Sequence, residues 1–322
     1  MIWLKKALNR INGLHFRQEY LCLGEELYQP LQCWLLLNYR PAVNITNRHS
    51  FLGYCPLIIS IPSEMVAGHE EIQIAYTLND LNPNGNFSKK DAIAWIVLRR
   101  IAEPPLDPSP LVALFKGIKG QHRFISGFSQ KVISLQNRLF NHKNGNVFLH
   151  DDLYRQVQIA YSIPRNISLI TIEQDGLYNL FPTDLHGLQD DNFYCISLRH
   201  AGKACNQVMS RRRIILSQME PKFYKTVYTL GKNHMQEPKS AACFPFSGTV
   251  SEKFKLPLPV GAVSYFELEL AGGFNHGIHR LMFFRQLNIK SLQPNGPVLT
   301  HIHNAFATWR HNNRLPGNYL LR

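Results

Sequence analysis

The sequence has few charged residues and no long apolar run. Charged residues make up 18% of the 322 residues, and no apolar stretch approaches the roughly 18–20 residues that a membrane-spanning helix needs. Segment 1–13 contains two lysines but no apolar stretch followed by small residues, so it does not resemble a secretory signal. We therefore expect a globular protein without a membrane partner.

Cysteine pairs and the common catalytic signatures are also missing. The six cysteines are scattered and form no CxxC pair, which favours reduced thiols in a cytoplasmic protein. The chain contains no GxGxxG, GxxxxGK(S/T), HExxH or GxSxG motif. A Rossmann-type nicotinamide site is therefore unsupported.

Positive charge is in excess. The chain has 35 Lys and Arg against 22 Asp and Glu, a net charge of +13, and such a surplus implies an anionic partner. Nucleic acid, anionic lipid and a phosphate-bearing cofactor all qualify. The run Arg211–Arg213 fits nucleic acid, but the basic residues are spread over the chain and no nucleic-acid motif is present. We expect a solvated basic face first, a phosphate-bearing cofactor second, and no nucleic-acid partner.

Two histidine pairs raise the question of a metal site. They are His276 with His279, and His301 with His303. The second pair would point to one face of a strand, as neighbouring ligands do. No cysteine, aspartate or third histidine completes a set at a recognisable spacing, so we expect no metal.

Strand patterns dominate the chain. Segment 71–78 alternates apolar and polar residues, as a half-buried strand does. Segments 166–172, 264–270 and 281–289 are similar, and four prolines between 104 and 110 form a stiff connector. One helix is predicted over 126–141. Its apolar stripe consists of Phe128, Val132, Leu135 and Leu139, and Ser126 is the expected N-cap.

The chain also resembles itself in part. Segment 96–101, followed by prolines, resembles 282–287, and 71–78 precedes the first copy much as 264–270 precedes the second. This similarity favours two related β-rich halves, with chance matching of strand composition as the alternative. It also favours a strand over 92–101, although Ser88 and Asp91 are spaced like a capping box that would open a helix over 89–102. In this alignment the first half is shorter, Ile93 falls opposite His279, and no first-half segment matches the one around Asn179.

The most specific pattern lies between residues 163 and 206, and it has a second part near residue 279. Its matching residues are Pro164, Arg165, Leu169, Thr171, Asp175, Gly176, Asn179 and Pro182, followed later by Gly277 and His279 before an apolar strand. This order resembles the flavin reductase-like family of FMN-binding split barrels, which includes the flavoredoxins. The resemblance covers about residues 150–322.

The resemblance implies a noncovalent FMN and assigns residues to it. The segment implied to line the isoalloxazine through main-chain groups is Asn179, Leu180, Phe181, Pro182, Thr183 and Asp184. Those implied near the ribityl phosphate are Arg199, Lys203, Cys205 and Asn206, since a cation and a helix N-terminus attract phosphate. His279 is the implied catalytic residue, at the exposed flavin face where substrate or a reductant such as NAD(P)H docks.

Two departures from the family pattern concern the site. Ala204-Cys205 stands where the family has a threonine after the basic residue, so one hydroxyl donor to phosphate is missing and Asn206 or Ser210 would have to replace it. Ile278 stands where the family has an aspartate. Both changes weaken the case for turnover more than the case for flavin binding.

We therefore predict a mostly β protein with a few helices, an FMN-binding split barrel in two degenerate copies. The expected parts are a degenerate half over 1–125, a connecting helix within 126–148 and a flavin reductase-like barrel over 149–322. The predicted function is hydride or electron transfer through bound FMN. The alternative is a non-catalytic relative that acts as a dimerisation or interaction module. Family members pair as homodimers, and a fused half would make an intrachain pseudo-dimer.

Overall fold

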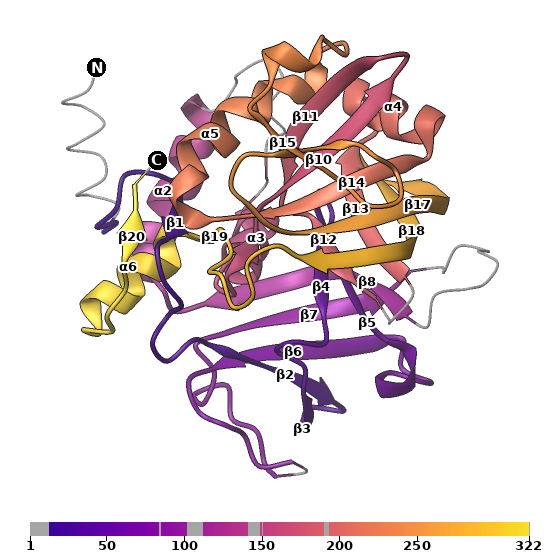
Figure 1. Cartoon of the computed structure of the whole chain (residues 1–322). Helices are drawn as coiled ribbons and strands as arrows, with labels where there is room; N and C mark the ends of the chain where they lie inside the picture. The colour runs from indigo at the N-terminus through magenta and orange to yellow at the C-terminus, as the bar shows by residue number, and fades with distance from the viewer. Residues whose placement is uncertain are drawn as a thin grey trace.

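The fold is mostly β, as predicted, and is built from two large antiparallel sheets. The computed structural model describes residues 13–83, 85–101, 112–140, 149, 151–189 and 193–321. In Figure 1 the first sheet lies below the second.

The first sheet has seven strands in the order β3-β2-β6-β7-β8-β5-β4. Along the chain they are β2 (Gln32–Leu37), β3 (Arg40–Asn44), β4 (Ser50–Tyr54), β5 (Leu57–Pro62), β6 (Glu71–Thr77), β7 (Ala94–Arg100) and β8 (Val112–His122). The alternation predicted for 71–78 is confirmed, since Ile72, Ile74 and Tyr76 face one buried core. The short helix η1 (Ser63–Met65) follows β5.

The second sheet has seven strands in the order β11-β10-β14-β17-β18-β13-β12. They are β10 (Ser168–Gln174), β11 (Leu177–Thr183), β12 (His186–Leu188), β13 (Phe193–Arg199), β14 (Arg213–Met219), β17 (Ala262–His276) and β18 (His279–Ser291). When strands are counted along each half, both sheets have the order 2-1-5-6-7-4-3. The two halves therefore repeat one topology.

The repeat has a different alignment from the predicted one. By strand order β7 matches β17 and β8 matches β18, so pairing 96–101 with 282–287 is wrong by one strand. Ile93 consequently does not fall opposite His279, and the first half is not too short, because β2 to β6 match β10 to β14. Strands of similar composition cannot be told apart by sequence, whereas their order in the hydrogen-bonded sheet distinguishes them.

The segment before β7 forms a turn and a strand rather than a helix. Asp91 Oδ2 accepts a hydrogen bond from Ser88 N (3.0 Å), and Asp91 N donates to Ser88 O (2.8 Å). The capping-box residues thus close a tight turn. The alternative of a helix over 89–102 is wrong, since Ala94–Arg100 pairs with both β6 and β8.

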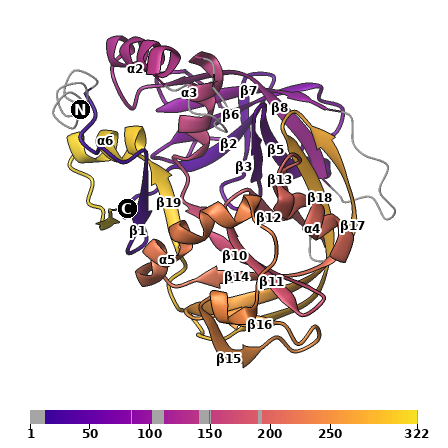
Figure 2. The same cartoon turned by 90° about the horizontal axis from the view of Figure 1, so that it is seen from above.

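Four of the helices are α2 (Gly127–Phe140), α3 (Asp151–Ala160), α4 (Lys203–Arg211) and α6 (Asn304–Asn312). In Figure 2, α3 lies against the first sheet and α4 against the second, while α2 and α6 lie to the side of both. Ser126 caps α2, since its Oγ accepts from Ser129 N at 3.1 Å. The predicted apolar stripe is wrong at two positions: Phe128 is 70% and Leu135 56% exposed, and α2 packs instead through Ser129 and Ile133. Val132 is half-buried, and the side chain of Leu139 lies outside the described part of the structure.

A small sheet brings the two ends of the chain together. Its order is β20-β1-β19-β9, made of β20 (Tyr319–Leu320), β1 (Tyr20–Leu23), β19 (Thr300–His303) and β9 (Arg165–Asn166). A strand near the N-terminus therefore pairs with strands from the last part of the chain. The boundaries 1–125, 126–148 and 149–322 stay a prediction.

The two large sheets share a core and a close contact. The shared cluster joins Leu52, Ile58 and Leu114 of the first half to Cys195, Leu281 and Phe283 of the second. At the contact of β4 with β12, a Cβ added at Gly187 would lie 2.1 Å from Ser50 Oγ. The first half thereby forms a wall beside the second.

A long connection between β14 and β17 packs over the edge strand β11. Its elements are η2 (Pro221–Phe223), α5 (Tyr224–Thr229), η3 (Leu230–Met235), η4 (Ala241–Cys243), β15 (Phe246–Val250) and β16 (Pro257–Pro259). Within the described part of the chain, no helix combines the length and apolar character that crossing a membrane requires.

Candidate functional site

A cleft of about 350 Å³ opens where the two halves meet. It lies between the ends of β11 and β13, the start of β18, the first turn of α4, and η3. Tyr54 at the end of β4 is the contribution of the first half. The lining residues are Tyr54, Pro182, Thr183, Asp184, Leu185, Ser197, Leu198, Arg199, Gly202, Ala204, Cys205, Gly231, His234, Met235 and His279.

His279 is a buried polar group without a partner in this cleft. Its side chain is 1% exposed, and neither Nδ1 nor Nε2 has a hydrogen-bond partner among the described residues. The ring meets Tyr54 edge to face, with 4.6 Å between centroids. Burial, with a smaller contribution from Arg199, lowers the pKa of His279 to about 4. A neutral imidazole without partners is costly in a folded protein, so a cleft ligand that bonds to it would recover that cost.

Ser197, two residues before Arg199, is a second buried polar residue of the cleft. Its hydroxyl is buried and has no hydrogen-bond partner among the described residues. Because a hydroxyl both donates and accepts, Ser197 and His279 together offer unused hydrogen-bonding capacity to a ligand in the cleft.

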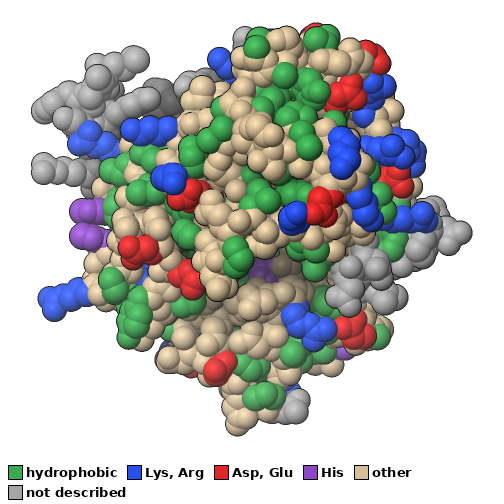
Figure 3. All heavy atoms as spheres, in the orientation of Figure 1, with side chains coloured by type: hydrophobic (Ala, Val, Ile, Leu, Met, Phe, Trp, Pro, Cys, Tyr) green, Lys and Arg blue, Asp and Glu red, His purple; other side chains and the backbone are tan. Residues whose placement is uncertain are grey.

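Positive charge lines one side of the cleft. Arg199 Nε donates to Tyr54 Oη at 2.7 Å, and its guanidinium lies 5.6 Å from the Tyr54 ring centroid. The first turn of α4 begins at Gly202, whose N-cap position has no side-chain hydrogen bond. A helix N-terminus beside an arginine attracts anions. Figure 3 shows basic side chains, with acidic ones among them, over the region of α4 and β17.

A carboxylate lines the same cleft. Asp184 Oδ2 accepts hydrogen bonds from Tyr161 Oη at 2.7 Å and from His301 Nε2 at 2.8 Å. Arg165, a buried cation, donates to Phe51 O at 2.9 Å and reaches Asp184 O at 3.4 Å. The cleft therefore carries opposite charges on different walls.

The structure places only part of the predicted site segment in the cleft. Of Asn179–Asp184, the last three residues line it. Leu180 and Phe181 are buried in two separate cores. Asn179 donates to Gln207 Oε1 at 2.7 Å, so its side chain is used inside the fold.

Only some of the residues that were predicted to lie near the phosphate line the cleft. Arg199 and Cys205 line the cleft with His279, whereas Lys203 and Asn206 do not. Lys203 pairs with Glu237 at 2.6 Å, and Asn206 is exposed. The i, i+3 geometry of α4 turns these two side chains away from the wall that Cys205 faces.

Several lining residues were missed from the sequence. Tyr54 comes from the other half and His234 from the β14–β17 connection, and neither belongs to a recognisable motif. His234 Nε2 bonds to Pro182 O at 2.7 Å, so the connection is tied to the end of β11. The packing of the halves brings Tyr54 to the cleft, and the folding of the connection back over β11 brings His234.

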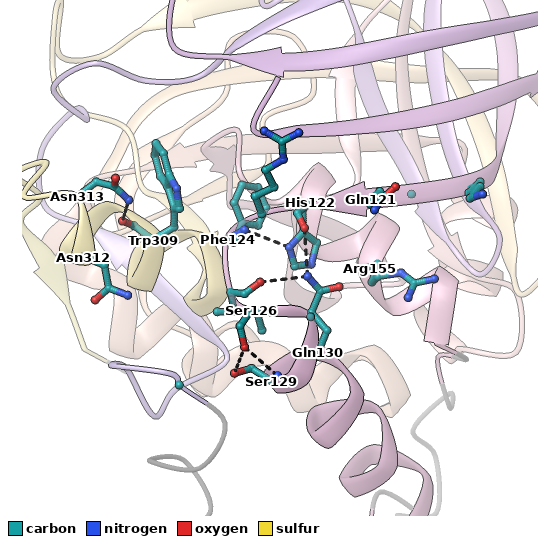
Figure 4. Close-up of a pocket in the computed structure, with 16 residues that line it drawn as sticks. Gln121, His122, Phe124, Ser126, Ser129, Gln130, Arg155, Trp309, Asn312 and Asn313 are labelled. Carbon is teal, nitrogen blue, oxygen red and sulfur yellow. Dashed lines mark hydrogen bonds between the residues drawn. The ribbon is translucent and has the colours of Figure 1, made fainter. Parts of the chain in front are cut away.

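A larger groove of about 970 Å³ lies elsewhere, between β8, α2 and α6 (Figure 4). Its lining includes Lys119, Arg123 and Arg155, and no carboxylate of the described residues lines it. Its histidine already has partners: His122 bonds to Gln158 at 2.9 Å and accepts from Phe124 N at 3.3 Å, and Arg155 Nε is the buried polar atom of the lining that has no partner among the described residues. The smaller cleft, with its unpartnered groups, is therefore the stronger candidate site.

The basic run 211–213 and the second histidine pair, noted in the sequence, form contacts within the fold. Arg211 pairs with Asp175 and Arg213 with Glu269, while Arg212 donates to a backbone carbonyl. His303 accepts from Ala305 N at the start of α6. Among the described residues, no group of three or more His, Cys, Asp or Glu side chains is arranged to hold a metal.

Acid is expected to destabilise the fold well before the carboxylates titrate. Burial lowers the pKa of His49, His122, His186 and His279 to about 4, against about 6.5 in the unfolded chain. Between these pH values the unfolded chain binds more protons, so the free energy of unfolding falls as the pH drops from about 6.5 to 4. Each imidazole contributes up to about 3 kcal/mol to this loss.

Urea unfolding between pH 7 and 4.5 measures this dependence. His49→Gln, which removes one titrating group away from the cleft, should make the fall in unfolding free energy shallower. An unchanged slope in this variant, or a flat profile in the unsubstituted protein, would contradict the assignment.

No protein-family model matches the chain, and no curated protein matches it. Solved structures do resemble it. An FMN-binding protein of Thermus thermophilus is 18% identical with a TM-score of 0.39, and the match covers 44% of this chain and 82% of that one. The styrene monooxygenase flavin reductase of Pseudomonas putida S12 is 17% identical with a TM-score of 0.38, covering 46% and 91%.

A third structure, an NADH:FAD oxidoreductase of Streptomyces globisporus, is 11% identical with a TM-score of 0.41, covering 47% of this chain and 89% of that one. These three structures are flavin reductases and FMN-binding proteins by description. Each match spans less than half of this chain but most of its own.

Proposed function

We propose that the chain binds a flavin nucleotide, FMN, noncovalently in the cleft and serves as a flavin-dependent oxidoreductase. The observation that carries the proposal is His279, buried in the cleft wall with neither ring nitrogen bonded to any residue that the structure describes. Buried polar groups in native proteins are rarely left without a hydrogen-bond partner, and a ligand in the cleft would supply one to His279.

The cleft residues fit the chemical parts of FMN. The volume of about 350 Å³ lies at the lower end of the roughly 300–1,000 Å³ of small-molecule sites. Arg199 and the first turn of α4 suit the phosphate, because both offer positive charge. Ser197 and His279 suit the polar ring edge, and Tyr54 offers an aromatic wall from the other half.

The roles of the chain's own residues follow from their positions. Bound FMN would supply the redox chemistry. Arg199 would bind the phosphate, Pro182 to Asp184 would set the plane of the ring, and His279 would hold a hydrogen bond as a neutral imidazole at neutral pH. The electron donor, NAD(P)H in our proposal, would dock on the open side.

The test is FMN binding to the purified protein, followed by the absorbance bands of bound flavin and the quenching of flavin fluorescence. His279→Phe should weaken FMN binding at least about 10-fold, since one hydrogen bond to the ligand is lost. The same change should leave the ligand-free protein as stable as before or stabilise it by about 1 kcal/mol, because it removes a buried unpartnered group.

His311→Phe, at an exposed position on α6, is the matched control and should change neither quantity. Flavin binding that His279→Phe leaves intact would move the site elsewhere. A protein that takes up no FMN would favour the alternative function, an interaction module without cofactor. The observation behind that alternative is that Lys203 is paired with Glu237 and does not face the cleft.

A further inference from the structure

Asp184 is held rigidly although it lines an open cleft. Both strong donors reach the same carboxylate oxygen: Tyr161 Oη lies 2.7 Å and His301 Nε2 2.8 Å from Oδ2. No hydrogen bond to Oδ1 is formed by any residue in the described part of the chain. The carboxylate is thus fixed through one oxygen, and the other is left for something in the cleft.

The donors are themselves fixed by further contacts. His301 Nδ1 bonds to Tyr228 Oη at 2.8 Å, and the Tyr20 ring stacks on the imidazole with 5.2 Å between centroids. These residues come from α5, β19 and β1, so distant parts of the chain converge on one side chain. A network with this many bonds restrains the rotation of Asp184.

The network also sets the charge of Asp184. Burial opposes its ionisation, but the hydrogen bonds from His301 and Tyr161 and the charge of Arg165 together hold the pKa of Asp184 well below its usual range. The side chain is therefore an ionised acceptor that cannot donate. Placed in the cleft, it attracts a ligand N–H or O–H and repels a ligand phosphate.

We propose that Asp184 selects the cleft ligand by a hydrogen-bond donor: its open oxygen accepts the imide N–H of a flavin-type ring, while the anionic end of the ligand lies toward Arg199. This inference rests on the proposed function and deepens it. It makes Asp184 a specificity-determining residue and Tyr161 and His301 positioning residues. The energetic basis is that a charge-assisted bond to a carboxylate is lost when the donor is absent, and the acceptor then stays desolvated.

The experiment compares FMN with 3-methyl-FMN, in which a methyl group replaces the imide hydrogen. Binding of each is titrated by quenching of flavin fluorescence, with no turnover needed. The unsubstituted protein should bind FMN roughly 10- to 100-fold more tightly than 3-methyl-FMN.

The variant Asp184→Asn tests the role of the carboxylate directly, because asparagine keeps the shape of the side chain and removes its charge. The amide oxygen can still accept from Tyr161 and His301, which directs the NH2 group into the cleft and replaces an acceptor with a donor. FMN binding should weaken and the preference over 3-methyl-FMN should fall to about 1-fold. Asp175→Asn, in the exposed turn between β10 and β11, is the matched control and should keep the preference.

The outcomes separate the two proposals. Equal binding of both flavins by the unsubstituted protein would overturn the role of Asp184 and leave flavin binding standing. Failure to bind either flavin would overturn the proposed function instead. If Asp184→Asn unfolds, the comparison in the unsubstituted protein still decides the question.

Discussion

Gly277→Ala is expected to lower the free energy of unfolding by about 3 kcal/mol, one of the two largest effects that we predict for a single substitution. Gly277 has φ +58° in the turn between β17 and β18, and a Cβ there would lie 2.1 Å from the backbone oxygen of Cys55 and 2.4 Å from Pro56 Cδ. The turn also bonds to the first half, since Ile278 N donates to Cys55 O at 3.1 Å. A backbone oxygen cannot rotate away as a side chain can, so the turn itself must shift.

The shift should also disturb the cleft, because His279 follows two residues later. FMN binding should therefore weaken in the same variant. Gly68→Ala is the matched control: Gly68 has φ +73° but nothing within 4 Å of an added Cβ, so it should lose only about 1 kcal/mol from backbone strain. If urea unfolding gave the same decrease in unfolding free energy for both variants, the contact with Cys55 would not contribute to the effect.

Arg310→Met is expected to cost about 3 kcal/mol of unfolding free energy. Arg310, on α6, is fully buried and donates to the backbone oxygens of Gln29 and Pro316, each at 2.8 Å, and of Tyr28. Methionine keeps the length of the side chain but removes every donor. The segments before β2 and after α6 then lose their common partner.

Two comparisons isolate this effect. Arg310→Lys keeps the charge but not the planar arrangement of donors, so it should be destabilised nearly as much. Arg285→Met, at an exposed position of β18, should change stability by less than about 0.5 kcal/mol. A neutral result for Arg310→Met in urea unfolding would mean that water replaces the guanidinium at no cost.

Local structure was predictable to the extent that it depends on side-chain period. The strands at 71–78 and 264–270 follow from alternation, because a strand exposes its two faces in turn. The stripe of Phe128 and Leu135 predicted α2 but not its orientation, since helical spacing shows which residues share a face and not what that face meets.

The cleft was predictable only in part, for the same reason. The order of the motifs predicted that Pro182, Asp184 and His279 lie near one another. The ion pair of Lys203 with Glu237 could not be predicted from spacing. Tyr54 belongs to a strand more than a hundred residues away in the chain. Its place in the cleft depends on how the halves pack, and that packing is a property of the whole fold.

The contact of β4 with β12 has a consequence for how the protein responds to dilution. In a pair of separate identical subunits, the equivalent contact is lost as concentration falls, and every substitution acts at both sites. Here a continuous polypeptide tethers the partners, so their association does not depend on concentration. Each substitution also acts once, which leaves Tyr54 and its counterpart in the other sheet free to differ in chemistry.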